Sequence, residues 1–141
     1  MKLNKIAATA ALLVFAGSGF AADIATTACT SSSTAVAAGI VTPTNLAQTN
    51  TLAAKIEDNC YVATPFTFNT SANVGVEMTQ TTVAFAVGTF NTRGRSYYTG
   101  SSEGGAVSVC GAPETGTTAP TAANLKTRLD VTEGCKVAEK K

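Results

Sequence analysis

Between residues 60 and 110, apolar residues alternate with small or polar residues at a period of two. This period is typical of strands that bury one face of a sheet. Segments rich in Asn, Thr and Gly separate the alternating runs, as expected where antiparallel strands reverse direction. The pattern predicts strands at residues 61–62, 66–68, 74–78, 83–87 and 106–110, with Val83, Phe85 and Val87 on one face.

The N-terminal half of the chain has a weaker pattern. Residues 22–44 are rich in Thr, Ser and Ala and lack an apolar period, which predicts an extended or loose lead-in. In residues 45–59, the spacing of Leu46, Leu52 and Ile56 is close to that of a helix, so one short amphipathic helix is predicted there.

The C-terminal part allows two interpretations. Residues 111–120 contain Pro, Gly and Thr and should form a loop, whereas residues 121–137 suit either a short helix or a last strand. Taken together, the patterns predict a β-rich fold, α+β but leaning to all-β. We expect an antiparallel sheet of about five short strands with one or two short helices, in a single domain over residues 45–141.

The first 21 residues have the three parts of a secretory signal peptide. Lys2 and Lys5 supply the positive start, residues 6–16 are apolar, and Gly19 and Ala21 place small residues at a cleavage site. The apolar stretch is shorter than the roughly 20 residues needed to cross a bilayer. The sequence therefore predicts an exported protein, periplasmic, extracellular or at the cell surface, with no membrane insertion after cleavage.

Composition narrows the functional classes. Charged residues make up 13% of the chain, and 10 Lys and Arg residues balance 9 Asp and Glu residues. No strongly basic stretch lies in the mature part, so no nucleic-acid partner is expected. Threonine supplies about a fifth of the mature residues, and a weakly charged, hydroxyl-rich surface repels further copies only weakly. Self-association or contact with other surface proteins is therefore expected.

Four cysteines remain after cleavage: Cys29, Cys60, Cys110 and Cys135. An even number of cysteines in an exported chain predicts two disulfides. Three pairings are possible, and closure of the shorter loops favours Cys29–Cys60 and Cys110–Cys135. A metal site would need close pairs such as C-x-x-C, whereas the nearest two cysteines are about 25 residues apart. No metal and no cofactor is expected.

Residues 95–105 resemble the nucleophile elbow of α/β-hydrolases, including tannase-like esterases, because Gly100, Ser102 and Gly104 match G-x-S-x-G. The resemblance implies Ser102 as the nucleophile. That mechanism needs a histidine to take the serine proton, and the chain contains no histidine. The chain is also too short for a doubly wound sheet. We therefore expect no catalytic residue and no enzymatic activity.

Arg93, Arg95, Tyr97 and Tyr98 form a local group of cations and aromatic side chains. Such a group can receive a carboxylate, a sulfated sugar or the acidic rim of a partner protein. It belongs to the loop predicted for residues 93–105. One hypothesis is therefore a soluble periplasmic or secreted binding module or inhibitor that uses this loop.

The composition favours a different hypothesis, an exported non-catalytic structural or cell-surface protein such as a subunit of an extracellular filament, matrix or coat. An exposed sheet edge in such a subunit could accept a strand from a neighbour. The lead-in over residues 22–44 is the natural donor, with Ile40 and Val41 as its apolar anchors.

Overall fold

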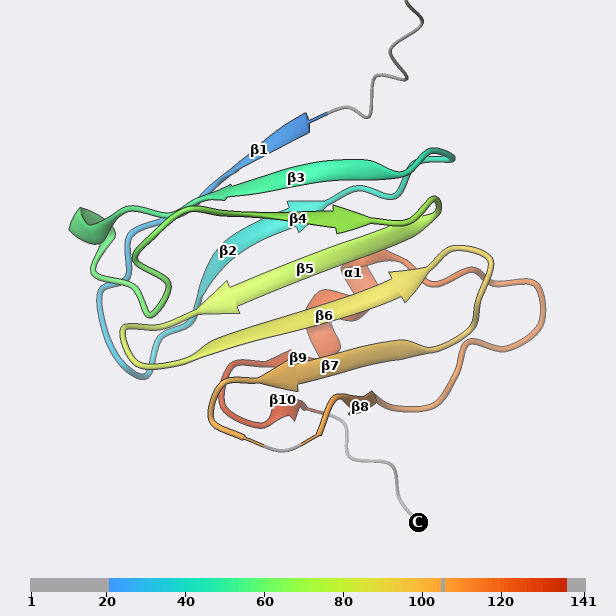
Figure 1. The fold of residues 1–141 in the computed structure, drawn as a ribbon. Coiled ribbons are helices and arrows are strands. Elements are labelled where there is room, and N and C mark those ends of the chain that lie inside the picture. The colour runs from blue at the N-terminus through green and yellow to red at the C-terminus, as the bar shows by residue number, and fades with distance from the viewer. Residues whose placement is uncertain (1–20, 105, 137–141) are drawn as a thin grey trace, which may run out of the picture.

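The alternating segments in the middle of the chain form the centre of a five-stranded antiparallel sheet (Figure 1). The computed structural model describes residues 21–104 and 106–136. The strand order is β2-β5-β6-β7-β8. These strands are β2 (Val36–Val41), β5 (Val74–Gln80), β6 (Phe85–Asn91), β7 (Tyr97–Ser101) and β8 (Ser108–Val109). The predicted β-rich fold built on an antiparallel sheet of about five strands is confirmed.

A second, three-stranded sheet packs on one face of the first. Its strands, in the order β1-β3-β4, are β1 (Ala21–Ala25), β3 (Gln48–Ala53) and β4 (Phe66–Thr70). β3 is antiparallel to β4 but parallel to β1. The core between the sheets contains Ile24 and Leu52 from one layer and Val41, Val76 and Met78 from the other. Removal of these side chains from water holds the two layers together.

A helix covers the opposite face of the five-stranded sheet, and Figure 1 shows it behind β5 and β6. This helix, α1 (Ala122–Arg128), begins after Thr121, whose hydroxyl accepts a hydrogen bond from the backbone N–H of Asn124. Such a cap satisfies one of the free N–H groups in the first turn. Two short strands follow, β9 (Leu129–Asp130) and β10 (Gly134–Cys135). The tail thus contains a helix and a small hairpin, so both alternatives for this segment occur in part.

Two disulfides staple the fold. Cys29–Cys60 joins the loop after β1 to the loop after the single 3-10 turn η1 (Ile56–Asp58), and Cys110–Cys135 joins the end of β8 to β10. This is the pairing that closure of the shorter loops favoured. Two disulfides indicate an oxidising, exported location. The predicted signal peptide lies outside the described residues except for its last residue, Ala21.

The helix predicted for residues 45–59 is wrong, because β3 and η1 occupy most of that range. In β3 the buried positions are Asn50 and Leu52, two residues apart, with partly or fully exposed neighbours between and around them. Leu46 and Ile56, which suggested a helical spacing, are exposed. The pairing of β3 with strands on both sides therefore overrode a weak local pattern.

Two segments are more ordered than the sequence indicated. The lead-in over residues 22–44 is not loose, because it contributes β2 and most of β1 to the two sheets. Ile40 and Val41 lie in β2 and pair with β5; Val41 is buried in the core, whereas Ile40 is 47% exposed. Residues 93–105 contain β7 and are not simply a loop, whereas residues 61–62 are not a strand.

Candidate functional site

The three-stranded sheet covers only part of the five-stranded sheet. The shared core lies mainly over β2 and β5, with Phe85 and Val87 of β6 packed at its border. β4 is hydrogen-bonded to β3 along one edge, and no described strand pairs with its other edge. The five-stranded sheet continues past β6 through β7 and β8. Among the described residues, the upper layer is therefore one strand short on this side.

A groove with a volume of about 410 Å³ lies where that strand is absent. It runs between β4 and the facing side chains of β5 and β6, and none of the described side chains that line it is ionisable. The rim residue Phe66 is 40% exposed. The large apolar side chains of the lining include Phe66, Phe68, Val76, Met78, Phe85 and Val87.

The uncovered face extends beyond the groove to the edge of the sheet. Residues opposite each other in antiparallel strands share a face, and Val87 pairs with Gly100 while Tyr98 pairs with Val109. A Cβ on Gly100 would lie 3.1 Å from the side chain of Val107, which places Val107 on this face too. Tyr98 is 47% exposed and Val107 is 72% exposed. An apolar strip thus continues from the groove to β8.

The opposite face of the same sheet is closed. Leu125 of α1 is fully buried against Phe90 and Tyr97. A Cβ on Gly88 would come within 2.6 Å of the Leu125 side chain, so the glycine makes room for the helix. At β6 and β7 the sheet is therefore covered by α1 on one side, whereas the three-stranded sheet leaves part of the other side open.

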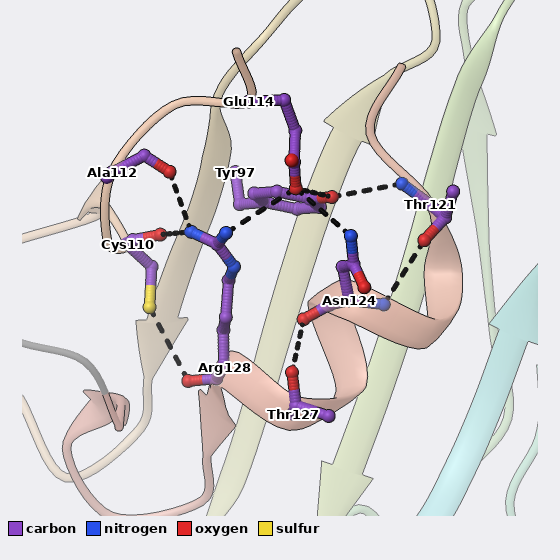
Figure 2. A network of polar contacts seen from close by, with 8 residues as sticks. All are labelled: Tyr97, Cys110, Ala112, Glu114, Thr121, Asn124, Thr127 and Arg128. Atoms are coloured by element: carbon purple, nitrogen blue, oxygen red, sulfur yellow. Dashed lines mark hydrogen bonds and ion pairs between the residues drawn. The ribbon is translucent and has the colours of Figure 1, made fainter. Parts of the chain in front are cut away.

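A polar network fastens α1 to β7 (Figure 2). The hydroxyl of Tyr97 donates to Glu114 Oε1 at 2.8 Å and accepts from the backbone N–H of Thr121 at 3.0 Å. Asn124 Nδ2 donates to the same oxygen of Glu114 at 3.1 Å. The guanidinium of Arg128 lies 4.5 Å from the centroid of the Tyr97 ring and 3.4 Å from Glu114. Hydrogen bonds, first from Tyr97, lower the pKa of Glu114.

The four residues predicted to bind a partner do not form one patch. Tyr97 is buried in this network, whereas its chain neighbour Tyr98 faces the opposite, open side of the sheet. Arg95 Nη2 donates to a backbone carbonyl at 3.0 Å, and Arg93 is exposed in the turn between β6 and β7. The cation that stacks on Tyr97 is Arg128, which the sequence analysis did not single out.

Ser102 is hydrogen-bonded to the backbone of Phe85. Its hydroxyl accepts a hydrogen bond from the backbone N–H of Phe85 at 2.9 Å, and its own N–H donates to the carbonyl of Phe85 at 2.8 Å. These bonds tie the turn after β7 to the start of β6, and the next element among the described residues is the strand β8, whereas a nucleophile elbow leads into a helix. Within the described ranges, no group of three metal-ligating side chains occurs.

A second cavity of about 250 Å³ is lined by Glu77, Lys126 and Lys136, among others. Glu77 is 3% exposed, and its Oε2 atom has no hydrogen-bond partner in the described part of the chain. Burial raises the pKa of Glu77, and the charge of Lys126 opposes this shift in part. Burial of a carboxylate with an unpaired oxygen costs stability, and the nearby charge of Lys126 offsets part of that cost.

Comparison with known proteins adds no further constraint. No protein-family model matches the chain, and no curated protein and no solved structure matches it. Within the residues that the structure describes, no helix is long and apolar enough to cross a membrane.

Proposed function

We propose that this protein is an exported, non-catalytic structural subunit that associates with further copies of itself in a surface fibre, matrix or coat. The observation that carries this proposal is the free edge of β4 beside the open apolar groove. A free edge presents unpaired backbone N–H and C=O groups, and the groove presents apolar surface. An added β-strand would satisfy both at once.

Three further features support this function. The two disulfides suit a protein that works outside the reducing cytosol. The low share of charged residues provides little repulsion between copies. The exposed side chains of Tyr98, Val107 and Val109 extend the apolar surface beyond the groove, and contiguous apolar surface of this kind marks interaction sites.

A groove that is filled by a segment of another copy can produce either an open or a closed assembly. A groove at one side of the molecule that is filled by a segment from elsewhere on the next copy makes a head-to-tail contact. Such contacts repeat into open assemblies unless the rotation between copies closes a ring. If each of two copies fills the groove of the other, the assembly closes as a two-fold dimer, and electron microscopy distinguishes this dimer from a filament.

The test is the association state of residues 22–141 with both disulfides formed, followed by light scattering and negative-stain electron microscopy. We expect concentration-dependent assembly for the wild-type protein. Phe66→Lys should reduce assembly by roughly tenfold or more, because an incoming strand would bury the ammonium group at the groove rim. Since Phe66 is already 40% exposed, the single subunit should tolerate this change.

Ile56→Lys is the matched control, because Ile56 is 75% exposed and does not line the groove. It should leave assembly unchanged. A wild-type protein that stays monomeric at every concentration, together with diffuse immunogold label on the source cells, would contradict the proposal. In that case a binding module that uses the exposed residues Arg93 and Tyr98 becomes the better hypothesis.

A further inference from the structure

Building on the proposed function, we infer that the strand that fills the groove is β1 of a second copy. One copy would lend Ala21–Ala25, or the part of it that remains after signal cleavage, to the free edge of β4 in the next. Three properties support this choice: the strand arrangement around the groove, its uncharged lining and the position of β1 at a sheet edge.

The sheet beneath the groove disfavours pairing between the β4 edges of two intact copies. The five-stranded sheet extends under the vacant position, because β6, β7 and β8 continue past the edge of β4. If the β4 edge of one intact copy paired with the β4 edge of another, the second copy would bring its own β6 to β8 into the same space. A lone strand that projects from its domain avoids this collision.

The chemistry of the groove matches β1. No ionisable side chain lines the groove, so an occupant must turn an uncharged face inward. In β1, the buried side chain of Ile24 points to one side of the strand, and the exposed side chains of Asp23 and Ala25 point to the other. The strand can therefore place Ile24 in the groove while the carboxylate of Asp23 stays in water.

β1 lies at an edge of the three-stranded sheet and contributes Ile24 to the core. Among the described strands it is hydrogen-bonded to β3 alone, and this pairing is parallel, which is slightly less stable per residue than antiparallel pairing. Cleavage after Ala21 would make β1 the N-terminal end of the mature chain, free to thread into a groove. The disulfide of Cys29 with Cys60 anchors the chain shortly behind β1, so a lent strand stays covalently fixed to its own domain.

The exchange would conserve the burial of Ile24 and cover additional surface. In the single copy, Ile24 packs where a Cβ on Gly39 would overlap it, next to Leu52. On β4 of a neighbour it would face Phe85 and Val87, and the strand would cover an apolar surface that is open in the single copy. The lending copy also uncovers the surface beneath β1, including Leu52, so assembly is driven by the difference between the apolar area covered at the groove and the area uncovered beneath β1.

Two complementary variants test the inference. Ile24→Asp removes the anchor of the donor strand but keeps the groove, whereas Phe66→Lys impairs the groove but keeps the donor. We expect each variant alone to be monomeric. Mixed in equal amounts, they should form a discrete heterodimer and stop there, because one good donor meets one good groove. Ala25→Asp, on the exposed side of the same strand, is the matched control and should assemble like the wild type.

A second measurement does not depend on how well Ile24→Asp folds. A photo-crosslinking residue replaces Ser71, which is exposed at the groove. Copies labelled with ¹⁴N and ¹⁵N are mixed, assembled and irradiated. We expect crosslinks from position 71 of one copy to residues 22–26 of the other isotope, identified by mass spectrometry.

The outcomes separate the inference from the proposed function. If Ile24→Asp assembles normally, or crosslinks from position 71 lead to a different segment of the second copy, then β1 is not the donor, although the protein still assembles. If crosslinks reach residues 22–26 only within one copy, the inference is overturned as well. If the wild-type protein itself does not assemble, the proposed function fails.

Discussion

The two faces of the five-stranded sheet are built from the same kinds of residue but end in different states. On one face, α1 covers Phe90 and Tyr97, and a hydrogen-bond network around Glu114 locks the helix in place. On the other face, Phe85 and Val87 border a groove, and the layer above them stops at β4. Whether a face of the sheet is buried thus depends on which element covers it. The period-two pattern alone makes either face suitable for burial.

A helix and a sheet edge differ in whether they can form further backbone hydrogen bonds with another chain. A helix satisfies its backbone hydrogen bonds internally and offers only side chains to its neighbours. A sheet edge keeps a row of unpaired backbone groups that can add another strand. The backbone groups within α1 are therefore largely paired, whereas the outer edge of β4 can still accept a strand.

The largest expected effect is the loss of stability when either disulfide is removed. Replacement of Cys110 and Cys135 by alanine should lower the free energy of unfolding by about 3–4 kcal/mol, because the bridge closes a loop that includes α1. Urea unfolding measures the loss, and hydrogen exchange should show reduced protection in α1. The corresponding change at Cys29 and Cys60 should cost a similar amount and leave the protection of α1 intact. Equal loss of protection in both variants would contradict this division.

The next effect compares one apolar side chain from each face. Leu125→Ala should cost about 3 kcal/mol, since Leu125 is fully buried and its loss leaves a cavity. Val87→Ala should cost less than about 1 kcal/mol in the monomer, because Val87 is only partly buried beside the groove. Urea unfolding of the monomers gives both values. Similar losses would mean that the groove is already filled in the single copy.

A smaller effect concerns the buried carboxylate of Glu77. Burial raises the pKa of Glu77 in the folded state, so stability decreases as the pH rises from the ordinary pKa through the raised one. Glu77→Gln should therefore raise the midpoint of thermal unfolding at pH 7 and change little below a pH of about 4. The exposed control Glu57→Gln should show no such gain. A destabilising effect of Glu77→Gln at pH 7 would contradict the assignment.

The smallest effect has the opposite sign and tests the network of the closed face. The pKa of Glu114 is lowered, first by the hydrogen bond from Tyr97, so this contribution to stability is present above the ordinary pKa. It is lost as the pH falls through the lowered pKa. Glu114→Gln should flatten the acid side of the stability profile measured by thermal unfolding. An unchanged acid slope would show that the Glu114 charge contributes no stability through this network.

Several features could be predicted from the sequence, since they depend on local patterns or on chain topology. The alternation around Phe85 and Val87 indicated a strand with both side chains on one face, and the spacing of the cysteines favoured the observed pairs. The helix expected for residues 45–59 failed because β3 is stabilised by partners on both sides that its own sequence does not contain.

The candidate site shows the same limit. The apolar residues of the groove were assigned to strands, but their pattern does not state which of them remain uncovered. Tyr97 and Tyr98 suggested one surface cluster because they are adjacent in sequence. In a strand, adjacent side chains point to opposite faces, so one lies in the core and the other on the open side.

The sequence by itself determined that this is a disulfide-stapled, β-rich chain with few charges and no histidine, because composition and a period of two are properties of the residues alone. The tertiary structure decided which strands became neighbours, which face α1 closed and where the upper layer ended. Those outcomes depend on packing between segments far apart in the chain. The free edge of β4, and with it the candidate site, exists only at that level.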